Sequence, residues 1–217
     1  MRSTSVQSSI KDATLVAKRR AQIIQSAIYL FKQKGFHRTT TREIAEQAGF
    51  SIGTLYEYVR TKEDVLFLVY EAINDYVYEH LQAIIEKSEP SVTNIIAMID
   101  HYFRLMDEMQ EEVLILYQEI KSLPTEKRDI VLQQERDMVQ LFKQAIMPLV
   151  AHTFTEKEIE VIVNNIFVQG QMWGFRRWLL QRTFTLDEYI QLQTKTILNM
   201  LHIDESHIAH RKNEEQL

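Results

Sequence analysis

The chain of 217 residues contains no cysteine, three prolines and five glycines. Without cysteine it cannot form a disulfide, a thiolate zinc site or a cysteine nucleophile. Few glycines and prolines mean few turn-forming positions, and the intervening residues are mostly helix formers such as Ala, Leu, Glu, Gln and Lys. We therefore expect an all-α fold of about nine helices.

Long hydrophobic runs are also missing. No apolar stretch reaches the ~18 to 20 residues that cross a bilayer, and the polar N-terminus lacks the hydrophobic stretch of a signal peptide, so we expect a soluble cytoplasmic protein. There is no Gly-rich phosphate loop, and no histidine has the Glu-x-x-His spacing of di-iron bundles. We predict that the protein is not an enzyme and has no catalytic residue, metal site or cofactor. Asp204, His207 and His210 have metal-like spacing, but they fall in a tail expected to fray.

The net charge of -5 conceals two regions of opposite sign. Residues 1–62 carry 11 Lys and Arg against 4 Asp and Glu, a net of +7, whereas residues 63–217 carry 14 against 26, a net of -12. A basic N-terminal third suits a polyanion such as DNA, which would repel the acidic remainder. We predict a flexible arm at 1–15, a DNA-binding domain at 16–62, a helical effector and dimerisation domain at 63–205, and a frayed tail at 206–217.

Two short helices joined by a tight turn are expected within the basic region. Thr40 followed by Glu43 has the spacing of a capping box, and Gly49 suits the left-handed conformation of a sharp turn. Ser51 can cap the second short helix. This arrangement is a helix-turn-helix, and a long helix beginning near Thr61 should connect it to the rest of the chain.

The same Thr-x-x-Glu spacing recurs at Thr155 and Thr185, where two final helices are expected over 156–182 and 186–202. The helix before them is expected to end near Pro148.

The motif GFxxTTxxxIAxxAGFSxGTLYxYxxxKExxL at residues 35–66 resembles the N-terminal domain of the tetracycline-repressor (TetR) family. The agreement spans about thirty positions; Val59 stands where the family usually has Phe, and Thr41 replaces a usual aliphatic residue. The resemblance implies a transcription regulator, by default a repressor, that binds operator DNA and releases it when a small molecule binds.

Roles within the motif follow from the chemistry of its side chains. The N-terminus of the first short helix suits a phosphate, and the first turns of the second suit base edges in the major groove. The resemblance implies backbone contacts by Tyr56, Tyr58 and Lys62, although either tyrosine could instead pack between helices. The basic cluster Lys18, Arg19 and Arg20 could reach a minor groove or be solvated. The expected DNA-binding residues are Thr40, Thr41, Arg42, Ser51, Ile52, Gly53, Thr54, Tyr56, Tyr58 and Lys62.

A ligand site is expected among Met, aromatic and polar side chains of the C-terminal region, although such residues at helical spacing are often ordinary core. Arginines beside apolar side chains favour an anionic acyl effector, such as a fatty acid or acyl-CoA. A cationic drug would instead need buried acids, for which Glu108, Glu111, Glu112 and Glu119 are candidates. The expected ligand-binding residues are Phe103, Met106, Tyr117, Phe142, Gln169, Trp173, Arg176 and Arg177.

A homodimer is expected because one recognition helix contacts few base pairs, whereas a two-fold pair binds a palindrome. The resemblance implies that the last two long helices form the interface. Gly170 and Gly174 lie four residues apart and permit close helix approach, so we predict an interface containing Ile166, Gly170 and Gly174. Two alternatives stay open: a multidrug-sensing repressor of an efflux gene, and a helical interaction protein without specific DNA binding.

Overall fold

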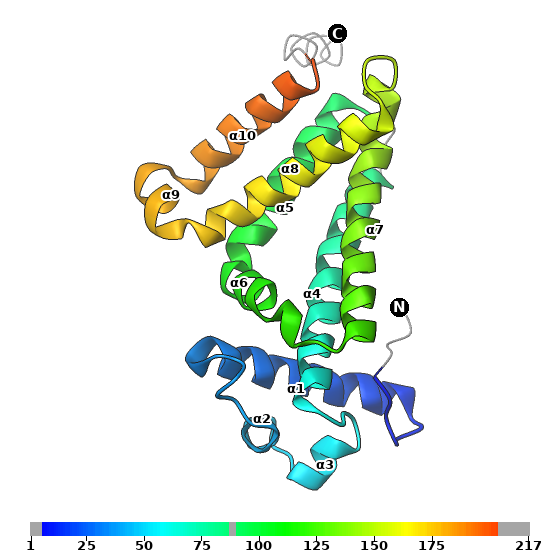
Figure 1. Cartoon of the computed structure of the whole chain (residues 1–217), viewed down its shortest axis with the longest axis vertical. Helices are drawn as coiled ribbons and strands as arrows, with labels where there is room; N and C mark the ends of the chain where they lie inside the picture. The colour runs from blue at the N-terminus through cyan, green and yellow to red at the C-terminus, as the bar shows by residue number, and fades with distance from the viewer. Residues whose placement is uncertain (1–5, 87–89, 204–217) are drawn as a thin grey trace, which may run out of the picture. The chain divides into compact units, whose positions relative to one another are not determined.

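A computed structural model of the chain describes residues 6–86 and 90–203 (Figure 1). Over these ranges it contains ten α-helices, one short 3-10 helix and no strand, which confirms the predicted all-α fold. No helix in this part of the chain is long and apolar enough to cross a membrane. The predicted tail at 206–217, its metal-like cluster and the first five residues of the predicted arm lie outside the described ranges.

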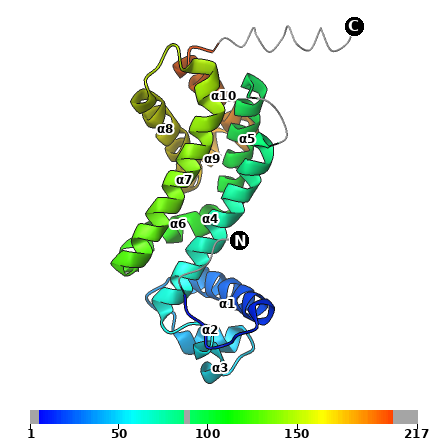
Figure 2. The same cartoon turned by 90° about the vertical axis from the view of Figure 1, so that its right-hand side faces the viewer.

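The chain divides into two compact units. The first comprises residues 1–76 and 111–135, and the second comprises residues 77–110 and 136–217. Two long helices, α4 (Lys62–Ile85) and α7 (Thr125–Val150), each contribute residues to both units (Figure 2). The first unit contains the whole predicted helix-turn-helix segment; the domain boundaries predicted from sequence stay a prediction.

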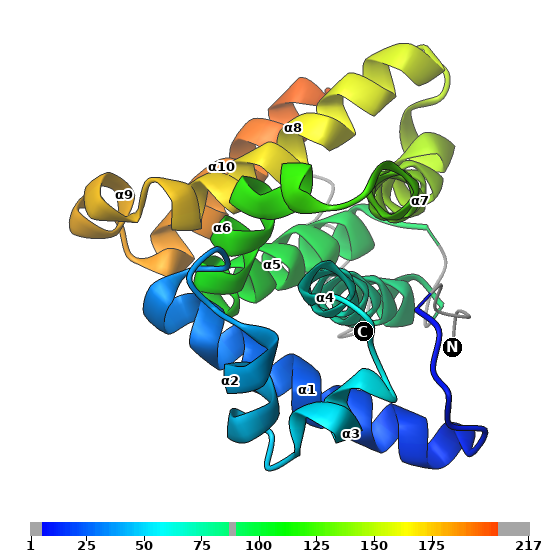
Figure 3. The same cartoon turned by 60° about the horizontal axis from the view of Figure 1, so that its bottom comes forward.

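The first unit is built around three helices that precede α4. Helix α1 packs against α2, and α2 against α3 (Figure 3). Their inward residues, including Ile23, Ile44 and Leu55, are fully buried. Most of α6 and the beginning of α7 complete this unit. The bounds are α1 Ala13–Lys34, α2 Thr41–Gln47, α3 Ile52–Tyr56, α6 Gln110–Glu119 and a 3-10 helix at Ile120–Ser122.

Helix ends in both units follow the signals in the sequence. Gly49 has a φ of 74°, the left-handed conformation predicted for it, and Gly35 ends α1 as its C-cap with a φ of 81°. Reciprocal capping boxes form at the N-termini of α2, α8 and α10, as predicted from Thr followed by Glu three residues later. These caps fix where the helices begin.

The second unit is a packed group of long helices. Helix α5 contacts both α8 and α10, and Figure 1 shows the three side by side. Two sequence predictions need correction. The helix expected over 156–182 breaks at Arg176, shortly after the weak helix former Gly174. Pro148 lies inside α7 rather than ending it; only two residues of the helix follow it, so a kink there displaces little of the helix. The bounds are α5 Val92–Glu108, α8 Glu156–Phe175, α9 Arg177–Thr183 and α10 Leu186–Met200.

The glycines of α8 have a different partner from the one predicted. A Cβ at Gly170 would lie 2.5 Å from the Tyr102 ring, and one at Gly174 would lie 2.8 Å from Gln110 Cβ. Ile166 is fully buried. The close approach that these small residues permit is therefore made within the chain, chiefly by α5, and their assignment to a dimer interface is corrected.

Candidate nucleic-acid interface

The exposed side of α2 and α3 gathers most of the residues predicted to bind DNA. Thr40 caps α2 by accepting a hydrogen bond from the Glu43 N–H, and Ser51 caps α3 by accepting one from the Thr54 N–H at 3.0 Å. Both caps are exposed. The caps and the Gly49 turn between them hold two helices that are too short to be stable alone.

The N-terminus of α2 offers what a phosphate group needs. Arg42 is exposed and makes no ion pair or hydrogen bond with any described residue. The Thr41 hydroxyl lies 3.2 Å from the Tyr56 hydroxyl, so these two side chains link α2 to α3. The nearby Glu43 carboxylate is paired with Lys34, and this contact, together with Thr40, lowers the pKa of Glu43 to about 2. Its negative charge is therefore offset locally.

The first turn of α3 presents small side chains at the surface. Gly53 is exposed, and a Cβ added there would meet only Ser51 Oγ, at 3.6 Å. The fold therefore gives no reason for a glycine at this position, whereas close approach of an outside molecule does. Ser51 Oγ and Thr54 Oγ1 lie 2.9 Å apart, and Ile52 is half-buried beside them.

The two tyrosines of the motif differ in exposure. Tyr56 is 49% exposed on the same side as Thr41, as a DNA-contacting residue requires. Tyr58 is only 3% exposed, and it lies among the packed residues that follow α3 together with the fully buried Val59. The predicted phosphate contact of Tyr58 is therefore corrected to a packing role.

Lys62 has its ammonium group turned inward. Its Nζ donates to the carbonyl oxygens of Phe36 and Thr39 at 3.0 Å and of His37 at 3.3 Å, and lies 4.4 Å from the centre of the Phe36 ring. An ammonium has three N–H donors, and all three are used. Lys62 therefore holds the loop between α1 and α2, and its DNA contact stays a prediction.

Two features of this region had not been predicted. Arg38, directly before the α2 cap, is exposed and has no partner among the described residues, and extending the phosphate argument to the basic segment before the cap could have found it. The described part of the predicted arm packs on the same unit, because Val6 is 6% exposed and Asp12 caps α1. The expectation of a free arm is corrected for residues 6–12, whose polar sequence carried no such signal.

In the second unit, three of the predicted ligand-binding residues lie in a buried aromatic cluster, and a fourth, Met106, is also buried. The Tyr189 ring is 5.0 Å from that of Trp173 and 5.9 Å from that of Phe103, and Phe167 is 5.1 Å from Phe142. Burial raises the pKa of the Tyr189 hydroxyl, which donates to the Gln169 carbonyl at 2.8 Å. The exposed fractions are zero for Phe103 and Phe142, 3% for Trp173 and 5% for Met106.

The other predicted ligand-binding residues have varied surroundings. Gln169 is half-buried, and its side-chain oxygen is buried without a hydrogen-bond partner among the described residues. Arg176 is exposed at the break between α8 and α9, and Arg177 stacks over Trp178 at 4.8 Å. Tyr117 is 68% exposed and belongs to the first compact unit, so its grouping with the others is corrected.

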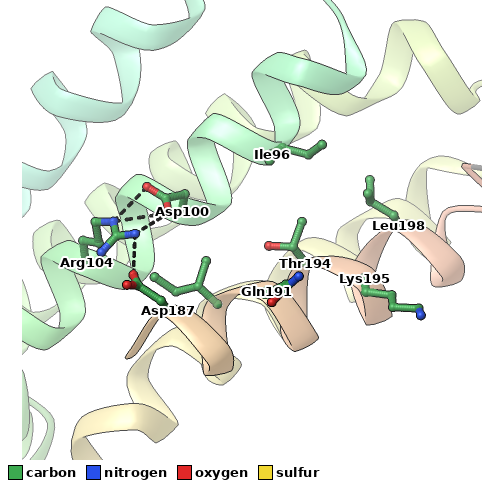
Figure 4. A pocket seen from close by; sticks show the side chains of 9 residues that line it. Ile96, Asp100, Arg104, Asp187, Gln191, Thr194, Lys195 and Leu198 are labelled. Carbon is green, nitrogen blue, oxygen red and sulfur yellow. Dashed lines mark hydrogen bonds and ion pairs between the residues drawn. The ribbon is translucent and has the colours of Figure 1, made fainter. Parts of the chain in front are cut away.

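A groove of about 410 Å³ lies between α5 and α10 (Figure 4). At one end Arg104 bridges Asp100 and Asp187, with Nη2 to carboxylate distances of 3.0 and 2.8 Å. Thr194 also lines it, and its hydroxyl is buried without a partner among the described residues. None of the residues predicted to bind a ligand lines this groove.

Three of the four acidic residues that a cationic drug would need already pair with basic side chains of the first unit. Glu111 and Glu112 pair with Lys32 at 3.1 and 3.0 Å, and Glu119 lies 3.2 Å from His37. All three belong to the first unit. Only Glu108 of the four candidates lies in the second unit, where it is exposed.

Comparison with known proteins agrees with this geometry. Residues 23–69 match the family described as bacterial regulatory proteins, tetR family. The HTH-type transcriptional regulator HbdR of Aromatoleum sp. (strain CIB) is 28% identical over 86% of this chain and 82% of its own length. A tetR-family regulatory protein from Rhodococcus RHA1 superposes with a TM-score of 0.71 at 25% identity, covering 85% of this chain and 97% of its own. AibR, solved in complex with isovaleryl coenzyme A and operator DNA, superposes with a TM-score of 0.68 at 18% identity, covering 82% and 97%.

Proposed function

This chain belongs to the TetR family of DNA-binding transcription regulators, and we propose that it is a repressor that contacts its operator through the exposed side of α2 and α3. The observation that carries the proposal is Gly53, which is exposed and where an added Cβ would make only an ordinary contact with Ser51 Oγ at 3.6 Å. A recognition helix enters the major groove by its first turns, and a glycine there lets the backbone approach the bases closely. Thr54 and Ile52 flank it, and Arg42 and Thr40 lie at the α2 N-terminus to hold phosphates.

The proposed repressor acts as a homodimer that pairs α8 and α10 with those of a second copy. Val161 and Val168, seven residues apart on α8, are 60% and 50% exposed, and Leu192 on α10 is 52% exposed. Residues at this spacing share one helix face, and exposed apolar side chains of this kind suit an interface. Two copies would place two recognition helices on half-sites about 34 Å apart, as a palindromic operator requires.

The proposed effector is an acyl-CoA or fatty acid. Support comes from AibR, a structural neighbour solved with an acyl-CoA, and from the aromatic and Met-containing interior of the second unit, which suits an acyl chain. The unpartnered oxygen of Gln169 lies beside that interior, and buried polar atoms normally have partners. Arg176 and Arg177 offer cations for an anionic head group.

DNA binding is tested with a duplex enriched by the protein from a random-sequence pool. Fluorescence anisotropy at ~150 mM salt compares that duplex with a scrambled one, because nonspecific binding is weak at this salt concentration and specific binding persists. The enriched sequence is expected to be palindromic and to bind at least ~1,000-fold more tightly. Equal affinity for both duplexes would support the helical interaction protein instead.

The effector is tested by adding acyl-CoAs of graded chain length to the preformed protein–duplex complex. Release by one range of chain lengths is expected, with quenching of tryptophan fluorescence that is retained in Trp178→Phe, and Arg176→Gln together with Arg177→Gln should weaken the release. Coenzyme A without an acyl group is the matched control. If no chain length releases the duplex while a cationic dye does, the multidrug alternative replaces this one.

The dimer is tested by sedimentation. Val168→Asp places a charge on the α8 side of the proposed interface and is expected to yield monomers. Gln191→Asp, at an exposed position of α10 that lines the groove toward α5, should leave the dimer intact. A monomeric wild-type protein would contradict this part of the proposal.

A further inference from the structure

The segment before α1 makes specific contacts with the end of the recognition helix. Residues 6–10, here called the strap, pass beside the residues that follow α3. The Ser9 N–H and the Ser8 hydroxyl each donate to the Glu57 carbonyl at 2.9 Å, and the Ser9 hydroxyl donates to it at 3.2 Å. Val6 is 6% exposed, which anchors the strap.

Arg20 of α1 joins the strap to α3. It is 8% exposed, and its Nη2 donates to the Val6 carbonyl at 2.6 Å and to the Tyr58 carbonyl at 3.2 Å. Burial lowers the pKa of this guanidinium, and Glu71 partly offsets the effect. One cation therefore holds two backbone carbonyls from separate segments at the same point.

These contacts fall where α3 needs support. The helix has five residues, and the last carbonyls of any helix lack partners within it. Directly after α3, the carbonyl of the capping residue Glu57 is satisfied by the strap, and that of the next residue, Tyr58, by Arg20. A short helix without such partners frays readily.

We propose that Arg20 and the strap position the recognition helix, so that operator selectivity depends on residues that do not touch the DNA. This inference rests on the proposed role of α3 in DNA binding. Arg20 is a positioning residue, since its guanidinium is buried and faces carbonyls, not phosphates. Because its Nη2 donates to the carbonyls of both Val6 and Tyr58, loss of the Arg20 side chain would separate the strap from the segment that follows α3.

The test compares variants on both sides of the contact in the full-length protein. Arg20→Met removes the donors, Arg20→Lys keeps one, and Ser9→Pro removes the strap's backbone donor while leaving Arg20 in place. Gln7→Ala, at an exposed strap position, is the matched control. Each is titrated with the duplex enriched by the wild-type protein and with its scrambled counterpart, and amide hydrogen exchange is followed over residues 52–58.

Arg20→Met and Ser9→Pro are expected to reduce the selectivity ratio by about tenfold, Arg20→Lys by less, and Gln7→Ala not at all. Exchange over residues 52–58 should quicken in the same order. The slope of log affinity against log salt should stay unchanged in Arg20→Met, because Arg20 does not touch a phosphate in this proposal. Loss of a phosphate contact would instead reduce the magnitude of the slope by ~0.9.

Three results would overturn the inference. They are a salt slope reduced by ~0.9 in Arg20→Met, a selectivity ratio unchanged in Arg20→Met and Ser9→Pro, and a lower melting temperature of these variants with unchanged hydrogen exchange in α3. If Arg20→Met does not fold, Ser9→Pro alone decides between these outcomes. If the wild-type protein itself cannot distinguish the two duplexes, the proposed function fails. A selective wild type with equally selective variants removes only the role of the strap.

Discussion

Gly53 in α3 and Gly170 in α8 lie in opposite surroundings. A Cβ at Gly53 would meet only Ser51 Oγ at 3.6 Å, whereas one at Gly170 would come within 2.5 Å of the Tyr102 ring. In the second unit, therefore, the close packing of α5 explains why position 170 is a glycine. At position 53, on the exposed side of α3, the fold would accept a larger side chain, so the glycine is explained by an approaching molecule and not by packing. In the proposed recognition helix, a residue for which the fold gives no reason is a candidate for contact with DNA.

The largest expected effect is on the stability of the second unit. Gly170→Ala forces the fully buried Tyr102 ring or the backbone of α8 to move, and such overpacking costs about 1 to 3 kcal/mol. Urea denaturation measures this loss. An unchanged unfolding midpoint would show that α5 and α8 are less closely packed than the structure indicates.

The matched substitution in α3 should have the opposite pattern. Gly53→Ala adds a methyl group that makes only an ordinary contact with Ser51 Oγ and replaces a poor helix former, so stability should stay the same or rise by up to about 1 kcal/mol. Affinity for the operator duplex should nevertheless fall about tenfold, since the added Cβ stands between the helix and the bases. Unchanged affinity, measured by anisotropy, would mean that this face of α3 does not approach DNA.

Lys62 and Arg42 sharpen the distinction between holding the fold and holding DNA. Lys62→Met leaves three loop carbonyls without their cation and should lower the stability of the first unit by about 1 kcal/mol, with no change in the salt dependence of operator binding. Arg42→Met should leave stability unchanged and reduce the salt slope by ~0.9. If Lys62→Met instead reduced the salt slope and left stability unchanged, Lys62 would be assigned a contact with DNA.

The smallest effect concerns the pH dependence of the first unit. The pKa of Glu43 is lowered to about 2 by Lys34 and Thr40, from an ordinary value near 4.3 in the unfolded chain. A lowered folded-state pKa means that the stabilisation is present above about pH 4.3 and is lost as the pH falls toward 2. Glu43→Gln should therefore flatten the acid limb of the melting-temperature profile. A parallel profile for the variant would show that the pairing is too weak to matter.

Local signals in the sequence predicted a large part of the fold. The capping boxes at Thr40, Thr155 and Thr185 and the left-handed conformation of Gly49 follow from neighbouring residues alone, and all are present. Placement of the site residues depended on contacts distant in sequence. Lys62 reaches carbonyls 23 to 26 residues away, so nothing in its own surroundings in the sequence shows that it faces inward.

The second unit shows the same limit in its packing. The spacing of Gly170 and Gly174 correctly indicated close helix approach, but it could not tell a helix of the same chain from one of a partner. The strap escaped prediction because polar residues such as Ser8 and Ser9 carry no periodic pattern, and their partner Glu57 is nearly fifty residues away.

The most direct test of DNA recognition by α3 is the selectivity of a protein altered only on the exposed face of that helix. Wild type and Ile52→Ala/Thr54→Ala are titrated at ~150 mM salt with the enriched duplex and its scrambled form, with Gln191→Ala/Lys195→Ala on α10 as a surface control. We predict a selectivity ratio that falls by about tenfold or more in the α3 variant, at unchanged stability, and is preserved in the control. An α3 variant that discriminates as well as wild type would contradict the assignment of α3 as the recognition helix.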